Sequence, residues 1–120
     1  MSEQWKWPKS VNVLGVTYKI NVVEREKDLY MKENNCDGWC DKTSHKIVVA
    51  AEDKDNELEC YESYLRKIIR HEIIHAFLFE SGLGENWSHS DWGHDETYVD
   101  WFAIQFPKIQ AAFHEAGVDF

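Results

Sequence analysis

The chain has 120 residues, of which 43% are hydrophobic, and it carries a formal net charge of −9 at pH 7. This length suffices for one hydrophobic core, so we expect a single domain that spans residues 1–120. The negative charge would repel phosphate backbones and anionic lipids. Nucleic acid and membrane surfaces are therefore excluded as favoured partners.

The sequence shows no signal peptide, membrane span or disulfide pattern. The first ten residues lack the apolar stretch of a signal peptide, and no run approaches the length of a membrane span. Three cysteines, an odd number, do not suggest a disulfide framework. We therefore expect a cytoplasmic protein.

The first half of the chain favours strands. Residues 11–24 are rich in β-branched side chains that partly alternate with polar ones, which predicts one strand with a possible bulge at Gly15. Residues 25–38 are charged and turn-prone. Residues 45–53 predict a second strand, and residues 39–40 a short strand beside it.

The second half changes to helical periodicity. Asn56, followed three residues later by Glu59, resembles a capping box, and Gly82 is a typical residue just beyond a helix end. A helix between these signals is apolar on nearly every side from Leu65 onward, so we expect it to be buried in the centre of the fold.

A polar loop over residues 83–94 is followed by a second helix from about Asp95. Its apolar face is expected to comprise Val99, Phe102, Ala103 and Phe106. Pro107 is expected to break or kink this helix, so that residues 108–117 form a short last helix. Strands first and helices after predict an α+β fold, with a small antiparallel or mixed sheet packed on the central helix.

The central helix carries the segment His71-Glu72-Ile73-Ile74-His75. Residues four apart lie one above the other on a helix, so both imidazoles can point at one metal ion. Zinc accepts imidazole nitrogen readily, and a catalytic zinc has three protein ligands and an open position for water. Glu72 projects about 100° around the helix from His71 and could accept a proton from that water.

Candidates for a third ligand follow at the second helix. Glu96 lies 21 residues after His75, and Asp100 follows one turn later on the same face. Glu96 could bind the metal while Asp100 accepts a hydrogen bond from the remote N–H of a ligating histidine. Ala103 continues this face and is small enough for close helix contact.

H-E-x-x-H followed by E-x-x-x-D resembles the gluzincin peptidases, and the short chain is more similar to small phage- or prophage-encoded zincins and ImmA/IrrE-like proteases. The resemblance covers residues 47–106. It implies a zincin-like fold with an active-site helix and a second ligand-bearing helix, Zn²⁺ as cofactor and peptide or protein substrates. It also implies that His71, His75 and Glu96 are ligands, that Glu72 is the general base and that Asp100 supports a histidine.

The same resemblance implies a metalloprotease that works in the cytoplasm of a bacterium or a phage-infected cell. Its substrate would lie extended along a sheet edge, for which residues 46–50 (KIVVA) are the candidate. Tyr98, His89 and His94 are candidates for stabilising a developing oxyanion.

Several alternatives stay open, among them hydrolysis of a non-peptide amide by the same metal centre. His94 could replace Glu96 as third ligand, as in SprT-like proteins, although only Glu96 has a correctly spaced Asp100. The domain could instead be a non-catalytic binding or phage-regulatory module with a structural metal. Finally, the cysteines could form a closed zinc site with His45, although buried thiols are the simpler interpretation for Cys36, Cys40 and Cys60.

Overall fold

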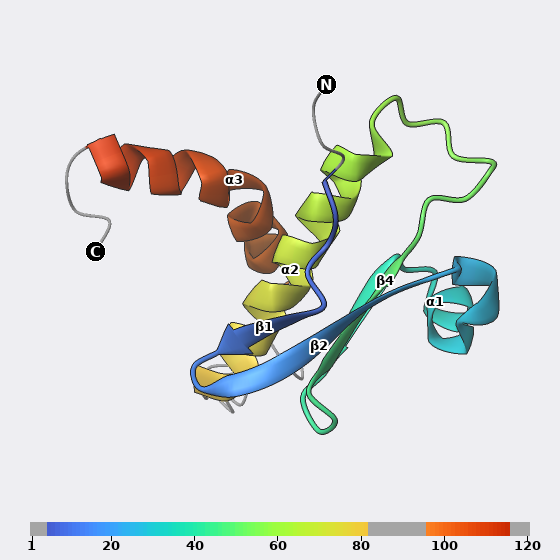
Figure 1. Ribbon diagram of the computed structural model, residues 1–120, viewed down its shortest axis with the longest axis horizontal. Coiled ribbons are helices and arrows are strands. Elements are labelled where there is room, and N and C mark those ends of the chain that lie inside the picture. Colours follow the sequence, from blue (N-terminus) through green and yellow to red (C-terminus); the bar gives the residue numbers. More distant parts are fainter. Residues whose placement is uncertain (1–4, 82–95, 116–120) are drawn as a thin grey trace.

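The computed structural model describes residues 5–81 and 96–115, and the side chains of these segments as far as residue 111. Within them, no helix is long and apolar enough to cross a membrane. In chain order the elements are β1 (Ser10–Val13), β2 (Val16–Val23), the short 3-10 helix η1 (Arg25–Lys27), α1 (Leu29–Asn34), β3 (Gly38–Asp41), β4 (Lys46–Ala50), α2 (Tyr61–Ser81) and α3 (Glu96–Glu115) (Figure 1).

A hairpin replaces the single bulged strand expected over residues 11–24. β1 and β2 pair antiparallel around a turn at Leu14 and Gly15, which both adopt positive φ angles of 51° and 91°. The Gly15 N–H donates to the Asn12 side chain over 2.9 Å. The expected bulge was wrong because two consecutive residues with positive φ reverse the chain and do not merely bend it.

The four strands form one mixed sheet in the order β1-β2-β4-β3, which confirms the expected α+β class. β2 and β4 run parallel, while β1 with β2 and β3 with β4 run antiparallel. β4 therefore pairs on both sides, and β3 lies at the edge. The expectation that residues 46–50 form a free edge was wrong, because a short strand at residues 38–41 covers them.

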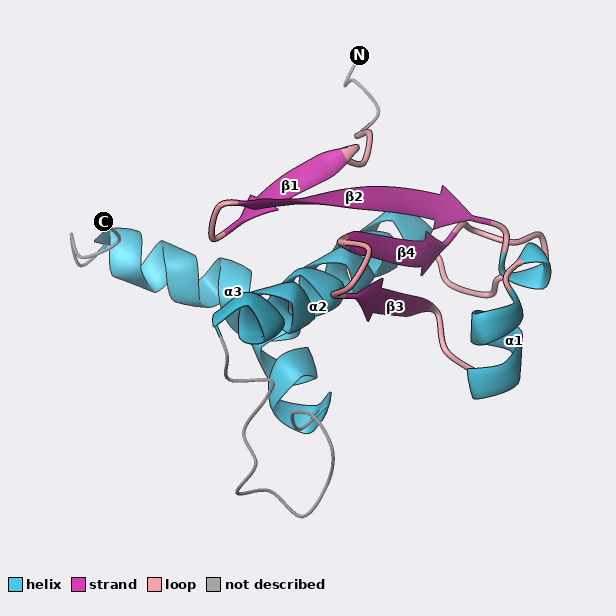
Figure 2. Cartoon of the chain, turned by 90° about the horizontal axis from the view of Figure 1, so that it is seen from below, coloured by secondary structure: helices cyan, strands magenta, loops and turns pink. Residues whose placement is uncertain are grey.

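The sheet packs one face against α2 (Figure 2). Alternate residues of β2 and β4 point at this helix because side chains of a strand alternate between its two faces. The main core consists of Val13, Tyr18, Ile20, Ile47, Val49, Leu65, Ile68, Ile69 and Ala76. A smaller cluster on the alternate positions of β4 joins Val48 and Ala50 to Met31 of α1.

α2 begins at Tyr61, four residues later than an N-cap at Asn56 indicated. The Asn56 side chain accepts a hydrogen bond from the Leu58 N–H over 3.0 Å, so it closes a local turn and caps no helix. Burial is concentrated on part of the helix, and Phe77 is 40% exposed. The helix is therefore not enclosed on every side, and Gly82 lies outside the described residues.

α3 is one continuous helix that contains Pro107, so the expected separate last helix was wrong. Val99 and Ala103 are buried as expected, but Phe102 and Phe106 are each 47% exposed. Figure 1 shows the reason: α3 crosses α2 near its first turns and then extends away from the sheet. Of the described side chains of α3, only Val99 and Ala103 are buried.

Candidate metal centre

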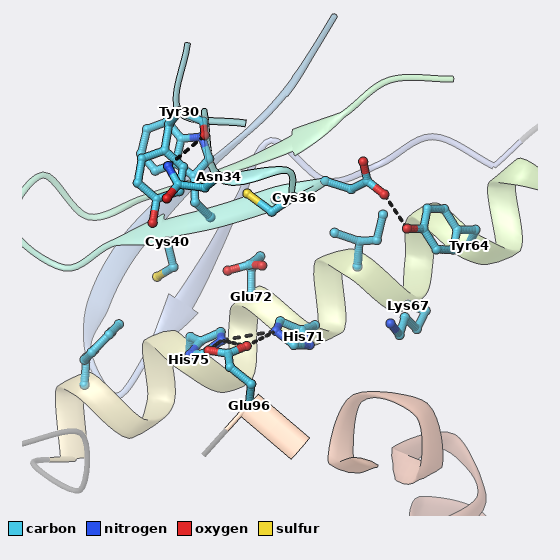
Figure 3. A pocket seen from close by; sticks show the side chains of 15 residues that line it. Tyr30, Asn34, Cys36, Cys40, Tyr64, Lys67, His71, Glu72, His75 and Glu96 are labelled. Atoms are coloured by element: carbon cyan, nitrogen blue, oxygen red, sulfur yellow. Dashed lines mark hydrogen bonds and ion pairs between the residues drawn. The ribbon is translucent and has the colours of Figure 1, made fainter. Parts of the chain in front are cut away.

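The two histidines of α2 converge as their spacing predicts. His71 and His75 lie one helical turn apart, and their Nε2 atoms are 3.1 Å from each other. His75 is 8% exposed, and His71 is half-buried. Both rings point toward Glu96, at the start of α3 (Figure 3).

Glu96, in the first turn of α3, completes the group. Its carboxylate oxygens lie 3.0 Å from His71 Nε2 and 2.9 Å from His75 Nε2. Among the described residues, this is the one group of three His, Cys, Asp or Glu side chains whose ligand atoms come together, all within 4.8 Å. The structure thus brings two helices together through potential metal ligands.

Asp100 lies one turn further along α3 and contacts the other nitrogen of His71. His71 Nδ1 and Asp100 Oδ1 are 3.1 Å apart, and Lys67 Nζ lies 2.6 Å from the same oxygen. Partial burial acts to raise the pKa of Asp100, but Lys67 and His71 outweigh it and hold this pKa below its ordinary value. Asp100 is therefore an anion that accepts from the His71 ring and orients it.

This donor set calls for a cation. If His71 Nδ1 donates to Asp100, a neutral His71 ring presents a lone pair at Nε2 to the Glu96 carboxylate. Lone pairs and negative charge repel at 3.0 Å unless a proton or a metal ion lies among them. Zinc bonds of about 2.0–2.2 Å place tetrahedral ligand atoms about 3.3–3.6 Å apart, a few tenths of an ångström wider than the separations of 2.9–3.1 Å found here. The residues present fit a zinc ion.

The pKa shifts of the same residues also show that a positive charge is favoured in this centre. Burial lowers the pKa of His71, but hydrogen bonds with Glu96 and Asp100 outweigh it, so the pKa lies above the ordinary imidazole value. The hydrogen bonds with His71 and His75 hold the pKa of Glu96 well below its usual range. The two carboxylates therefore favour a positive charge at His71.

Glu72 projects from α2 toward β3, on the side of Cys36 and Cys40 (Figure 3). It is 5% exposed, and burial raises its pKa to about 7, although the nearby imidazoles of His75 and His71 act in the opposite direction. A carboxyl with a pKa near neutrality can both accept and return a proton at physiological pH. A divalent cation beside it would lower this pKa further.

Gly38 on β3 makes room for the Glu72 carboxyl. A Cβ atom at this position would lie 3.1 Å from Glu72 Oε2 and 2.9 Å from Ile68 Cγ2. The sequence had suggested only a turn at this glycine. A glycine inside a strand also marks a close approach of another group, and that signal would have identified it.

Glu72 and the histidines line a cleft of about 570 Å³ between α2 and the segment formed by α1 and β3. α1 is capped by Asp28, whose side chain accepts from the Met31 N–H over 2.9 Å and from Trp39 Nε1 over 3.2 Å. The cleft wall includes Tyr30, Cys36, Cys40, Tyr64, Lys67 and Phe79.

The alternative cysteine site gains no support from the described residues. Cys36 and Cys40 are half-buried in the cleft wall, while Cys60 is exposed, so the expected burial of all three thiols was wrong. The ring of His45 makes an edge-to-face contact with the ring of Tyr18. Of the oxyanion candidates, Tyr98 is 68% exposed on α3, and His89 and the alternative ligand His94 lie outside the described residues.

Comparison with protein-family models, with curated proteins and with solved structures gives no significant match to this chain. The resemblance to gluzincins therefore depends on the motif residues alone. The function of this chain is therefore inferred from the geometry and chemistry of this centre, since fold-level analogy cannot supply it.

Proposed function

We propose that this chain is a small zincin-like domain that hydrolyses peptide bonds, with Zn²⁺ held by His71, His75 and Glu96. The observation that carries the proposal is the convergence of two imidazole nitrogens and one carboxylate, 2.9–3.1 Å apart, beside the buried carboxyl of Glu72. Three nitrogen and oxygen ligands with an open fourth position are typical of catalytic zinc.

Each residue then has a distinct task. When bound, zinc supplies a Lewis acid that polarises a carbonyl and lowers the pKa of a water molecule. Glu72 accepts the proton of the attacking water and returns it to the leaving amine. Asp100 fixes the ring orientation and the proton position of His71.

The edge strand β3 is the better candidate for binding an extended substrate, in place of the interior strand β4. One side of β3 pairs with β4, and its residues line the cleft that contains Glu72 and the histidines. A peptide could add to the free side through backbone hydrogen bonds, which bind many sequences without side-chain selection.

Cleavage of an unfolded protein substrate by zinc-loaded protein tests this mechanism. Glu72→Gln keeps the shape of the side chain but removes the base, so we expect the rate to fall by about 10²–10⁴-fold while zinc binding persists. Glu62→Gln is a matched control, because Glu62 pairs only with Arg66 on the same helix in the described contacts.

Equal cleavage by wild type and Glu72→Gln would contradict the role of Glu72. Zinc binding without cleavage by the wild type would instead favour the non-catalytic binding module, in which the same residues hold a structural metal. Mass spectrometry of the products locates the cleaved bonds. Cleavage by a contaminating protease would not depend on the variant, so the comparison of wild type with Glu72→Gln excludes it.

A further inference from the structure

Pro107 leaves one backbone carbonyl of α3 without its usual partner. In an α-helix the N–H of each residue donates to the carbonyl four residues earlier, and proline has no N–H. Pro107 lies inside α3, so the carbonyl of Ala103 has no intrahelical donor from that position. Ala103 is fully buried, and a buried carbonyl needs a donor from elsewhere.

Arg70 of α2 supplies that donor. Its Nε lies 2.5 Å from the Ala103 carbonyl oxygen, in a contact that joins residues 33 positions apart. A charged donor makes a stronger hydrogen bond than a neutral one, and the planar guanidinium fixes its direction. The neighbouring Arg66 differs, since it pairs with Glu62 within α2.

The Arg70 contact is one of several along the two helices, among them the contact of Lys67 with Asp100. Moving up α2 and down α3, Arg70 meets Ala103, His71 meets Asp100, and His75 meets Glu96. The helices therefore run antiparallel at this point, and each contact fixes the register of the next.

Glu96 depends on this register. Its side chain is 68% exposed, so little packing of its own holds the carboxylate against the imidazoles. Ligand distances in metal sites tolerate only about ±0.2 Å. A slight rotation or shift of α3 would therefore separate Glu96 from His71 and His75, and the anchored Ala103 turn prevents that motion.

We propose that Arg70 is a positioning residue for the third metal ligand, acting through the Ala103 carbonyl that Pro107 leaves free. This inference rests on the proposed zinc site. Arg70 is neither one of the candidate ligands nor part of the cleft wall. Its role is to hold α3 at the distance and rotation at which Glu96 meets the two histidines.

Zinc affinity, measured by competition with a chromogenic chelator, tests the proposal. We expect Arg70→Met to weaken zinc binding by about 10–100-fold, the range found when groups that orient metal ligands are removed. Arg66→Met is the matched control, and we expect no change in its affinity. Arg70→Lys keeps a cationic donor of similar reach and should recover part of the loss in zinc affinity. This second variant also tests the proposal if Arg70→Met does not fold.

Pro107→Ala tests the origin of the effect. It restores an N–H that donates to the Ala103 carbonyl, so Arg70→Met should weaken zinc binding less in this background than in the wild type. Cobalt substitution adds a spectroscopic readout. The visible spectrum of Co²⁺ bound to Arg70→Met should shift toward that of Glu96→Ala, because the carboxylate leaves the metal in both.

The outcomes separate the two proposals. If wild type binds zinc and Arg70→Met binds it equally, with an unchanged cobalt spectrum, the positioning role is overturned and the zinc site stands. An equal loss with and without Pro107 would overturn the role of the free carbonyl. If the wild type binds no zinc, the proposed site fails, and the positioning role fails with it.

Discussion

The two sides of α2 are held by different forces. Toward the sheet, α2 presents apolar side chains that belong to the main core, namely Leu65, Ile68, Ile69 and Ala76. Toward α3 it presents polar groups, of which Lys67 and His71 meet Asp100, His75 meets Glu96 and Arg70 meets a backbone carbonyl. Only Val99 and Ala103 of α3 are buried among its described side chains.

This difference separates the stability of the fold from the assembly of the centre. Apolar burial is non-directional and roughly proportional to the buried area. The packing of these apolar side chains of α2 against the sheet therefore does not itself depend on pH. The contacts with α3 depend on direction and charge, and they respond to protons and to metal ions. We therefore expect the sheet side to determine stability and the α3 side to determine metal affinity.

A cavity in the sheet side tests this division with the largest effect. Ile20 of β2 is 3% exposed in the core, and β4 and β3 separate its strand from the free edge beside the cleft. Ile20→Ala should lower the free energy of unfolding by about 2–5 kcal/mol, because it removes buried methyl groups and leaves a cavity. Denaturant unfolding of zinc-free protein measures this loss.

The same variant should bind zinc as the wild type does, within about twofold, as long as it remains folded. Chelator competition at a temperature well below the unfolding midpoint checks this. A large loss of zinc affinity in Ile20→Ala would break the separation, since it would show that core packing also sets the ligand geometry.

Glu72 lies between the apolar side of α2 and the metal centre, and Glu72→Gln should change the free energy of unfolding less than Ile20→Ala does. Burial raises the Glu72 pKa from 4.5 to about 7, so the folded state favours the protonated carboxyl. The stabilising effect of that proton is complete below the unfolded pKa and is lost as the pH rises through about 7. Zinc-free Glu72→Gln avoids the loss and should be more stable than wild type at higher pH, by up to about 3 kcal/mol.

Unfolding of zinc-free wild type and Glu72→Gln across the pH range measures this difference. It should grow from near zero at acidic pH to its full value above neutral pH. A constant difference at every pH would show that Glu72 titrates alike in the folded and unfolded states, and the assignment of a near-neutral base would then be wrong.

The sequence predicted the elements well where periodicity was strong. Alternating residues placed β2, and the apolar run placed the body of α2. The hairpin at Leu14 was not predictable from composition, because only Gly15 favours a positive φ angle and Leu14 does not. The onset of α2 was misplaced because Asn56 forms a turn as readily as a helix cap.

Residue spacing along the helices also predicted the candidate ligands. Helical geometry alone places His71 above His75 and Glu96 above Asp100, and the structure brings the two pairs together. The contributions of Lys67 and Arg70 depend on how α3 approaches α2. Such contacts join residues far apart in the chain, so no local pattern could have predicted them.

Zinc titration of the purified, metal-free protein tests the central claim most directly. We predict that the wild type binds one Zn²⁺ per chain, that Glu96→Ala binds it far more weakly, and that Glu62→Ala matches the wild type. Wild type that binds no stoichiometric zinc would contradict the account. Undiminished binding by Glu96→Ala, with a loss in His94→Ala, would place the third ligand at His94 and contradict the role of Glu96.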